Sequence, residues 1–385
     1  MIYYGKQNIS EEDIKAVADV LRSELITQGP VVEKFEKAIA EYCGAKYAVA
    51  CANGTAALHI ACLSLGIGKG DIVYTSPNTF VASANCALFC GASVDFVDID
   101  IETYNMDVFK LEEKLIEAKK NNKIPKAVIP VHFAGQSCEM DKIYSLSKEY
   151  GFFILEDACH ALGGKFNNKP VGSCEFSDAA VFSFHPVKMI TTGEGGMVLT
   201  NKKEIYEKLK LLRTHGIIKE PEFMTKEPDG TWYYEMIDLG FNYRITDFQA
   251  ALGLSQLKRL NDFIKKRNEI AENYNKQLKD LPVKTPKVNN NTLSAFHLYV
   301  VQINLEAINN NKNKFFLAVR EKGVELHVHY IPVHLQPYYT KLGFKKGDFL
   351  VSENYYECAI TLPLYVDLSE SDQEKVVHSL KNVLK

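Results

Sequence analysis

The stretch from Ala179 to Gly196 reads AAVFSFHPVKMITTGEGG. Its first six residues, through Phe184, form an apolar run with the length of one buried strand. Lys188 follows shortly after, in a loop of small and flexible residues. An amine held just past a buried strand is partly withdrawn from water yet accessible to a small molecule, and such a lysine can form a Schiff base. A lysine in a glycine-rich loop is more often only a solvated charge. The rest of the sequence must therefore show whether Lys188 has a chemical role.

Further apolar runs of strand length flank this stretch, and helical patterns such as Gly54–Leu65 and Met140–Tyr150 separate most of them. Strands that are apolar on both faces and alternate with helices indicate an α/β fold, in which helices cover both faces of a mostly parallel sheet. Ligands of such sheets bind at the carboxyl ends of the strands. The runs that complete seven strands are Tyr47–Cys51, Ile72–Thr75, Val94–Val97, Ala127–Val131, Phe152–Leu155 and Met197–Leu199.

The alternation fades after Asn201, and a charged helical pattern runs from Ile245 to Leu278. The remainder has an α+β pattern: strands at His297–Ile303 and Leu326–Tyr330, a helix at Lys312–Lys322 and a closing helix from Ser369. We therefore expect two domains. Residues 1–250 would form a large α/β domain that includes the N-terminal segment, and residues 251–385 a small C-terminal α+β domain.

Composition narrows the classes of function. The 385 residues are 46% hydrophobic and 24% charged with a net charge of −3, which argues against nucleic acid as the main partner. Nine scattered cysteines without a CxxC pair argue against a disulfide framework or a zinc site and favour a reducing cytoplasm. The segment Met1–Lys6 lacks the apolar core of a signal peptide, and no apolar run has the length of a membrane span. We expect a cytoplasmic protein without membrane or metal partners.

The turn after the first strand is Asn53-Gly54-Thr55, and it leads into a helix. Free N–H groups and the helix dipole favour an anion there, and Gly54 allows a phosphate to approach closely. Taken alone, this tripeptide is more often just the start of a plain capped helix.

Asp157 and His160 follow the fifth strand. A carboxylate at that depth needs a partner, and a protonated pyridine nitrogen would be a good one; the alternative is a cap for the next turn. A histidine on a short turn is more often structural. Together with the Ser183 hydroxyl and Lys188, these groups match what pyridoxal 5′-phosphate (PLP) requires: an anion cradle, an acid for a ring nitrogen and a Schiff-base lysine.

With these motifs the sequence resembles the nucleotide-sugar aminotransferases of the DegT–StrS type, which are PLP enzymes of fold type I. The resemblance runs nearly end to end, and its most specific motif is the stretch around Lys188. The other matching segments are Ile26–Pro30, Asn53–Thr55, Thr79-Phe80, Glu156–Gly163, Leu212–Gly216, Gly240–Arg244 and His329–Pro332.

The resemblance implies a role for each matching residue. Lys188 would bond the cofactor, Asp157 would pair with the pyridine nitrogen, and His160 would lie beside the 3-hydroxyl group. Phe80 would stack on the ring, where many relatives have Trp. Gly54, Thr55 and Ser183 would hold the phosphate. The residue matching Asn242 reaches the phosphate of the neighbouring subunit in the family, so a homodimer with shared active sites is implied.

The resemblance also implies the reaction, in which L-glutamate donates its amine through PLP to a nucleotide-linked 4-keto-6-deoxy sugar. Within the family the chain looks most like the branch that makes UDP-4-amino-4,6-dideoxy-N-acetyl-β-L-altrosamine, a step toward pseudaminic acid. Candidate contacts of the sugar or diphosphate are Arg213, His215, His329 and Tyr330. The alternative for the first two is charge at a helix C-terminus, and for the last two it is strand packing.

Three other functions remain open. The chain could aminate another UDP- or dTDP-keto sugar at the 3- or 4-position. It could be a dehydratase that uses pyridoxamine phosphate, although such relatives carry a histidine where this chain has Lys188. It could be a non-catalytic PLP-binding regulator, although the sequence shows no basic or helix-turn-helix appendage.

Overall fold

The computed structural model describes residues 1–309 and 311–384. Its centre is a seven-stranded sheet in the order β1-β9-β8-β5-β4-β2-β3, in which β9 runs antiparallel to both neighbours and the other pairs are parallel. This confirms the predicted α/β fold with a mostly parallel sheet. The strands are β1 (Tyr47–Cys51), β2 (Ile72–Thr75), β3 (Ser93–Phe96), β4 (Ala127–Ile129), β5 (Phe153–Asp157), β8 (Ala179–Ser183) and β9 (Gly196–Thr200).

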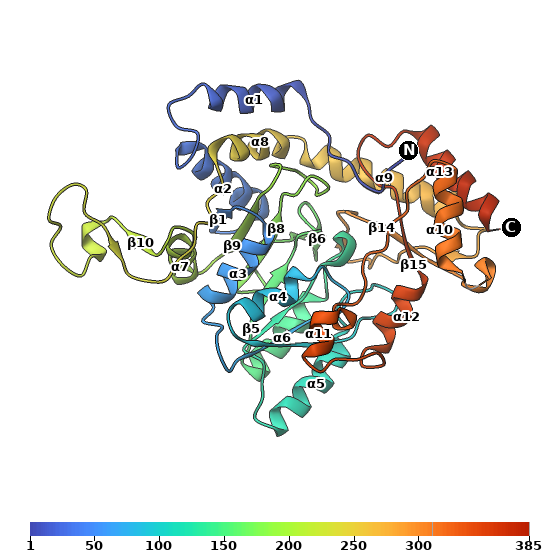
Figure 1. Ribbon diagram of the computed structural model, residues 1–385, viewed down its shortest axis with the longest axis horizontal. Coiled ribbons are helices and arrows are strands. Elements are labelled where there is room, and N and C mark those ends of the chain that lie inside the picture. Colours follow the sequence, from blue (N-terminus) through green and yellow to red (C-terminus); the bar gives the residue numbers. More distant parts are fainter. Residues whose placement is uncertain (310, 385) are drawn as a thin grey trace.

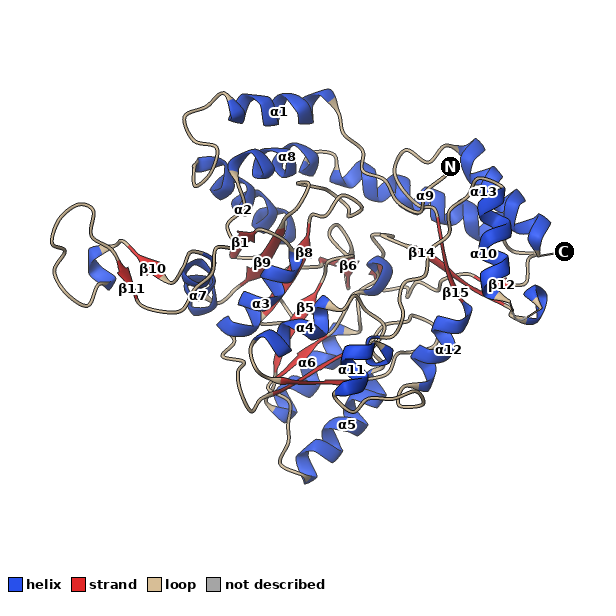
Figure 2. Ribbon diagram, viewed as in Figure 1, coloured by secondary structure: helices blue, strands red, loops and turns tan. Residues whose placement is uncertain are grey.

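Helices cover both faces of this sheet, and Figure 2 shows its strands gathered between them. Packing of one face involves α3 (Gly54–Ser64), α4 (Ala82–Phe89) and α7 (Lys203–Arg213). Packing of the other involves α2 (Pro30–Cys43), α5 (Val108–Lys120), α6 (Met140–Tyr150) and α8 (Asp247–Leu257). The strands are apolar on both sides because both sides are buried.

A second core lies around the antiparallel sheet β12-β14-β15. It includes Ile2, so the start of the chain packs with its C-terminal part, and the N-terminus lies near α13 in Figure 1. The domain boundary at residue 250 stays a prediction. The elements around this core are β12 (Val283–Lys284), β14 (Tyr299–Ile303), β15 (Ala359–Leu362), α10 (Lys312–Glu321) and α13 (Glu370–Val383). Of the other helices in this part of the chain, α11 (Pro337–Lys341) packs on the core of the large sheet through Tyr339, and α12 (Leu350–Cys358) contributes Tyr355 to a smaller cluster.

Two sequence expectations were wrong in detail. The pattern from Ile245 to Leu278 is two helices, α8 and α9 (Leu260–Gln277), and beside the break Arg259 pairs with Asp13 of α1 (Glu11–Leu21). The expected strand Leu326–Tyr330 pairs only through one bridge, from His327 to Thr361. Side chains replace the ladder there, since Tyr355 donates to the carbonyl of His329 at 2.7 Å.

An arm projects from the body beyond α7, at the left of Figure 1. It contains β10 (Ile217–Ile218) and β11 (Glu235–Met236), while β6 (Lys165–Phe166), β7 (Lys169–Pro170) and β13 (Thr292–Leu293) form another small sheet. Trp232 in the arm is 77% exposed.

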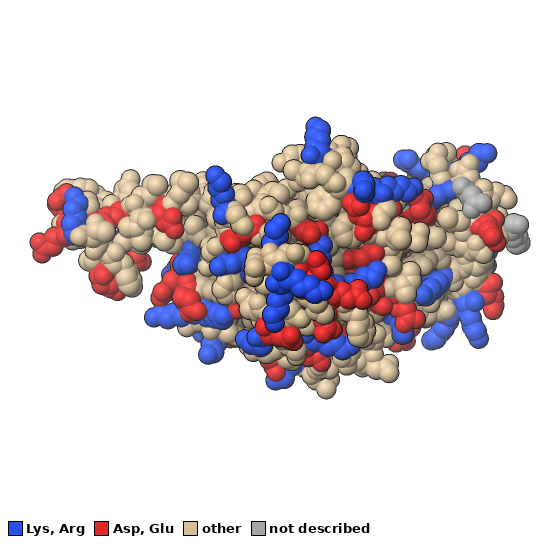
Figure 3. All heavy atoms as spheres, turned by 90° about the horizontal axis from the view of Figure 1, so that it is seen from below, with Lys and Arg blue, Asp and Glu red and all other residues tan. Residues whose placement is uncertain are grey.

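On the face shown in Figure 3, acidic and basic side chains are interspersed. Among the described residues, no helix is long and apolar enough to cross a membrane.

Candidate active site

A cavity of about 720 Å³ opens at the carboxyl ends of β1, β5 and β8. Its position is the one that parallel sheets offer to ligands, because the loops leaving the strands diverge there. Most of the predicted site residues line it although they are far apart in sequence: Gly54, Thr55, Phe80, Asp157, His160, Ser183, Lys188, His329 and Tyr330.

The phosphate cradle expected after β1 is the N-terminus of α3. Asn53 caps this helix by accepting from the Ala56 N–H at 2.8 Å, and the helix begins at Gly54. A Cβ at Gly54 would come within 3.0 Å of the Cβ of Ser183, so the glycine lets the helix start approach the end of β8. Backbone N–H groups and the hydroxyls of Thr55 and Ser183 therefore share one wall of the cavity, as an anion site requires.

Asp157 ends β5 and is 5% exposed. Its Oδ2 accepts from the Ser83 hydroxyl at 2.5 Å, and its Oδ1 accepts from the Cys159 N–H at 3.2 Å. Ser83 in turn contacts the Thr79 hydroxyl at 2.7 Å. These contacts fix the orientation of a buried carboxylate at the cavity wall, where it can pair with a cationic ring nitrogen.

Lys188 extends into the same cavity from the loop after β8. Burial lowers the pKa of its amine, while Cys159 and Asp157 act in the opposite direction. The amine is therefore neutral at a lower pH than an ordinary lysine, which favours nucleophilic attack and proton transfer. Its Nζ lies 3.4 Å from His297 Nε2.

His160, His329 and Tyr330 form the opposite part of the wall. Tyr330 Oη lies 3.1 Å from His160 Nε2, and His329 Nδ1 lies 2.8 Å from the Thr361 hydroxyl. Burial lowers the pKa of His329 to about 3, with further contributions from His327 and Lys188. Burial and the Lys188 charge also lower the pKa of His160. Both rings are thus neutral near pH 7 and can donate or accept hydrogen bonds.

Three predicted residues lie outside this cavity within one chain. Arg213 Nη1 binds Glu36 Oε1 at 2.5 Å and the Ala50 carbonyl at 2.9 Å. His215 and Asn242 are both exposed. They lie on neighbouring segments, which are joined by an isolated antiparallel β-bridge between Thr214 and Asn242.

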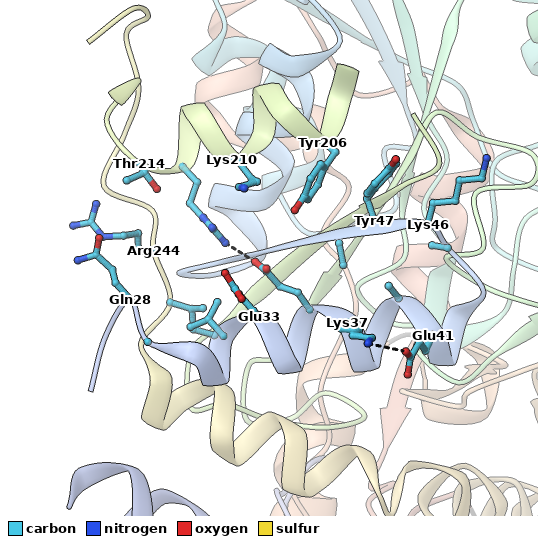
Figure 4. Close-up of a pocket in the computed structure, with 18 residues that line it drawn as sticks. Gln28, Glu33, Lys37, Glu41, Lys46, Tyr47, Tyr206, Lys210, Thr214 and Arg244 are labelled. Atoms are coloured by element: carbon cyan, nitrogen blue, oxygen red, sulfur yellow. Dashed lines mark hydrogen bonds and ion pairs between the residues drawn. The ribbon is translucent and has the colours of Figure 1, made fainter. Parts of the chain in front are cut away.

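Arg213 instead lines a second cavity of about 640 Å³ beside α2, β1 and α7, shown in Figure 4. Positively charged lysines and negatively charged glutamates surround it, and the labelled Lys37 and Glu41 form an ion pair at 3.9 Å. Lys188, the predicted Schiff-base lysine, and the buried carboxylate of Asp157 line the first cavity, which is therefore the candidate active site.

The cavity is also lined by residues that were not among the predicted site residues. Ser83 follows the Thr79-Phe80 motif by one helical turn and could have been found by that spacing. His297 precedes β14, and Tyr4 reaches the cavity from the N-terminal segment. No periodicity links these two to Lys188, because only the tertiary fold brings the segments together.

The cavity fits pyridoxal phosphate by its donor set. The anion cradle, the fixed carboxylate of Asp157 and the amine of Lys188 line one space of suitable volume for a small ligand. Phe80 is 56% exposed at its wall, which leaves a ring face available for stacking. His160 Nδ1 is buried and lacks a partner among residues 1–309 and 311–384. Within the same residues, no three His, Cys, Asp or Glu side chains are grouped to hold a metal ion.

Replacing Gly196 with alanine should disturb the cradle from behind. A Cβ there would overlap the Asn53 carbonyl and lie 2.7 Å from the Gly54 nitrogen. Overpacking of this kind costs about 1–3 kcal/mol, and here it displaces the start of α3. We expect a lower melting temperature and weaker binding of pyridoxamine phosphate, measured by thermal unfolding and fluorescence titration. Gly68→Ala is the control because its Cβ meets open space, and equal behaviour of the two variants would contradict this account.

Comparisons with known proteins agree with this geometry. The model of the DegT/DnrJ/EryC1/StrS aminotransferase family matches residues 7–381. The UDP-4-amino-4,6-dideoxy-N-acetyl-β-L-altrosamine transaminase of Campylobacter jejuni serotype O:23/36 is 40% identical over 387 residues, covering 100% of this chain and 98% of the relative.

Two solved structures share the whole fold. Helicobacter pylori PseC, an aminotransferase described as involved in pseudoaminic acid biosynthesis, has a TM-score of 0.89 at 33% identity and covers 100% of this chain and 99% of its own. The PLP form of a putative sugar aminotransferase from Streptococcus pneumoniae has a TM-score of 0.88 at 28% identity, with coverages of 99% and 98%.

Proposed function

Because the chain belongs to the DegT/DnrJ/EryC1/StrS aminotransferase family and is an aminotransferase that uses pyridoxal phosphate, we propose that it aminates a UDP-linked 4-keto-6-deoxy sugar with L-glutamate as donor. The proposed substrate is UDP-2-acetamido-2,6-dideoxy-β-L-arabino-4-hexulose, and the product is the 4-amino sugar used for pseudaminic acid. The observation that carries amine transfer is Lys188 in the cavity beside Asp157, because a dehydratase of this scaffold would have a histidine at position 188.

Pyridoxal phosphate, when bound, supplies an electron sink for the carbon that loses a proton. Asp157 then holds a proton on the ring nitrogen through its negative charge, and Ser83 keeps the carboxylate oriented. The start of α3 and the Thr55 and Ser183 hydroxyls would hold the phosphate group in the cavity that Lys188 also lines.

Lys188 performs the proton transfer. Its Nζ would accept the proton from the amine-bearing carbon of glutamate. In the sugar half-reaction the same Nζ would deliver a proton to the sugar carbon that receives the amine. Burial lowers the pKa of this amine, which favours the neutral form that can accept a proton. The wall formed by Phe80, His329 and Tyr330 would contact the sugar.

We propose a homodimer whose second subunit completes the site. Asn242 is exposed and lies off the cavity of its own chain, as expected for a residue that serves the phosphate of a partner. The predicted substrate contacts of Arg213 and His215 would likewise need a surface beyond the cavity of one chain. A cytoplasmic location is part of the proposal and is supported by the nine cysteines, all of which are free thiols.

A substrate panel tests this function. The purified protein should transfer the amine of L-glutamate to the UDP-linked 4-keto sugar with a kcat/KM at least about tenfold higher than for dTDP-linked 4-keto sugars. A pocket that matches one nucleotide binds the transition state of the other more weakly, by about 1 kcal/mol or more. NMR of the product gives the position and configuration of the new amine. Preference for a dTDP sugar would contradict the pseudaminic assignment, and failure of glutamate to convert bound PLP to pyridoxamine phosphate would favour a regulator.

A further inference from the structure

We propose that His297 is a positioning residue for Lys188, which holds the lysine amine in place whenever that amine is not bonded to the cofactor. The inference rests on the proposed function, since it concerns the amine that moves the proton. His297 was not among the predicted site residues, and it comes from the segment before β14.

The contact between His297 and Lys188 is sheltered from solvent. His297 is 4% exposed and lines the cavity, and its Nε2 lies 3.4 Å from Lys188 Nζ. Among residues 1–309 and 311–384 this is the one hydrogen-bond partner of that amine. A long lysine side chain otherwise has four rotatable bonds, so a fixed partner decides where the nitrogen points.

The backbone that carries His297 is clamped on both sides. Arg267 Nη1 donates to the carbonyl of Phe296 at 3.1 Å and to that of His297 at 3.4 Å. From the other side, a Cβ at Gly135 would lie 2.7 Å from the Phe296 nitrogen and 3.0 Å from the His297 nitrogen. A glycine therefore allows the two segments to touch, and these contacts hold the backbone of His297 in place.

Phe296 adds a second sign of constraint. Its φ is 44°, in the left-handed region that bulky residues avoid. Such strain persists only where the surroundings over-determine the backbone, and it gathers at functional sites. Here the strained residue is directly followed by the histidine that meets Lys188.

Charge explains why a histidine suits this position. The titratable and charged groups around its ring are Lys188, His160, Arg267 and His329, and the rings of His160 and His297 are 4.4 Å apart. Burial, followed by these neighbours, lowers the pKa of His297, so the ring is neutral. A neutral imidazole can donate to a neutral amine and accept from a charged one, and so it can hold Lys188 in both protonation states.

Two substitutions separate positioning from packing. His297→Gln keeps a polar group near the place of Nε2, whereas His297→Asn is too short to reach Lys188. His378→Asn is the control, because it removes an exposed histidine on α13. For each protein we would measure how fast the visible band forms when PLP is added to apoprotein, and the affinity for pyridoxamine phosphate, which has no aldehyde for the lysine to bond.

We expect His297→Asn to slow band formation and the single-turnover reaction with saturating glutamate by about 10- to 100-fold, as for a catalytic group misplaced by about 1 Å. Affinity for pyridoxamine phosphate should stay within about twofold of the wild type because the cradle is intact. His297→Gln should recover most of the rate, and His378→Asn should match the wild type.

Two results would overturn the inference: wild-type rates in His297→Asn, or a parallel loss of band formation and pyridoxamine phosphate affinity, which means a structural role. Failure of the wild-type protein to form any band with PLP is a different outcome. That result would contradict the proposed function itself. Failure of the His297 inference and failure of the proposed function can therefore be told apart.

Discussion

A Lys188→Ala variant should lose the visible absorption band with PLP and transfer amine at least about 10³-fold more slowly than the wild type. Two contributions vanish together: the covalent attachment of the cofactor, and a general acid–base group, which alone contributes about 10²- to 10⁴-fold. The cavity should still bind pyridoxamine phosphate, because the start of α3, Thr55 and Ser183 are unchanged. Absorption spectra and kcat with glutamate measure the effect.

Lys202→Ala is the matched control for this substitution. Lys202 pairs with Asp178 at 2.6 Å, at the end of the sheet opposite to the cavity, so its loss should leave transfer unchanged. A surviving visible band in Lys188→Ala would mean that another lysine bonds the cofactor.

The second large effect is expected for Asp157→Asn. The variant should keep its bond with PLP through Lys188 but transfer amine about 10²- to 10⁴-fold more slowly. Breaking a buried ion pair costs about 3–5 kcal/mol, and each 1.36 kcal/mol is a factor of ten in rate. Asparagine keeps the size of the side chain and an oxygen for the Cys159 N–H, so the fold should persist. Stopped-flow measurement of the glutamate half-reaction isolates the affected step.

Asp178→Asn serves as the control because it also removes a carboxylate from this sheet. Asp178 accepts from the Ile154 N–H at 2.7 Å, far from the strand ends that form the cavity. We expect it to lower stability modestly without changing the half-reaction rate. If the two variants transferred amine at the same rate, Asp157 would have no role in the chemistry.

The central sheet was predictable because its strands are buried on both faces. Each of the seven apolar runs, including Tyr47–Cys51 and Ile72–Thr75, is a strand of that sheet, shifted by a residue or two at some ends. Short strands such as β10 and β11 left no signal, since two residues carry no periodicity. The Leu326–Tyr330 run failed as a strand because side chains take the backbone groups that a ladder would use.

The site was predictable where a residue follows a strand directly. Gly54, Asp157 and Lys188 lie at the carboxyl ends of β1, β5 and β8, which run in the same direction, so topology brings them to one edge of the sheet. His297 and Tyr4 come from segments with their own packing, and only the docking of those segments places them at the cavity. The same limit applies to Arg213, whose partner Glu36 is distant in sequence.

Peptide mapping after borohydride reduction tests the central claim most directly. Borohydride converts the linkage between PLP and its lysine into a stable amine, which mass spectrometry can locate. The account predicts one modified peptide, which contains Lys188, and loss of the modification when glutamate is added before reduction. A pyridoxyl group on a different lysine, or on none, would contradict it.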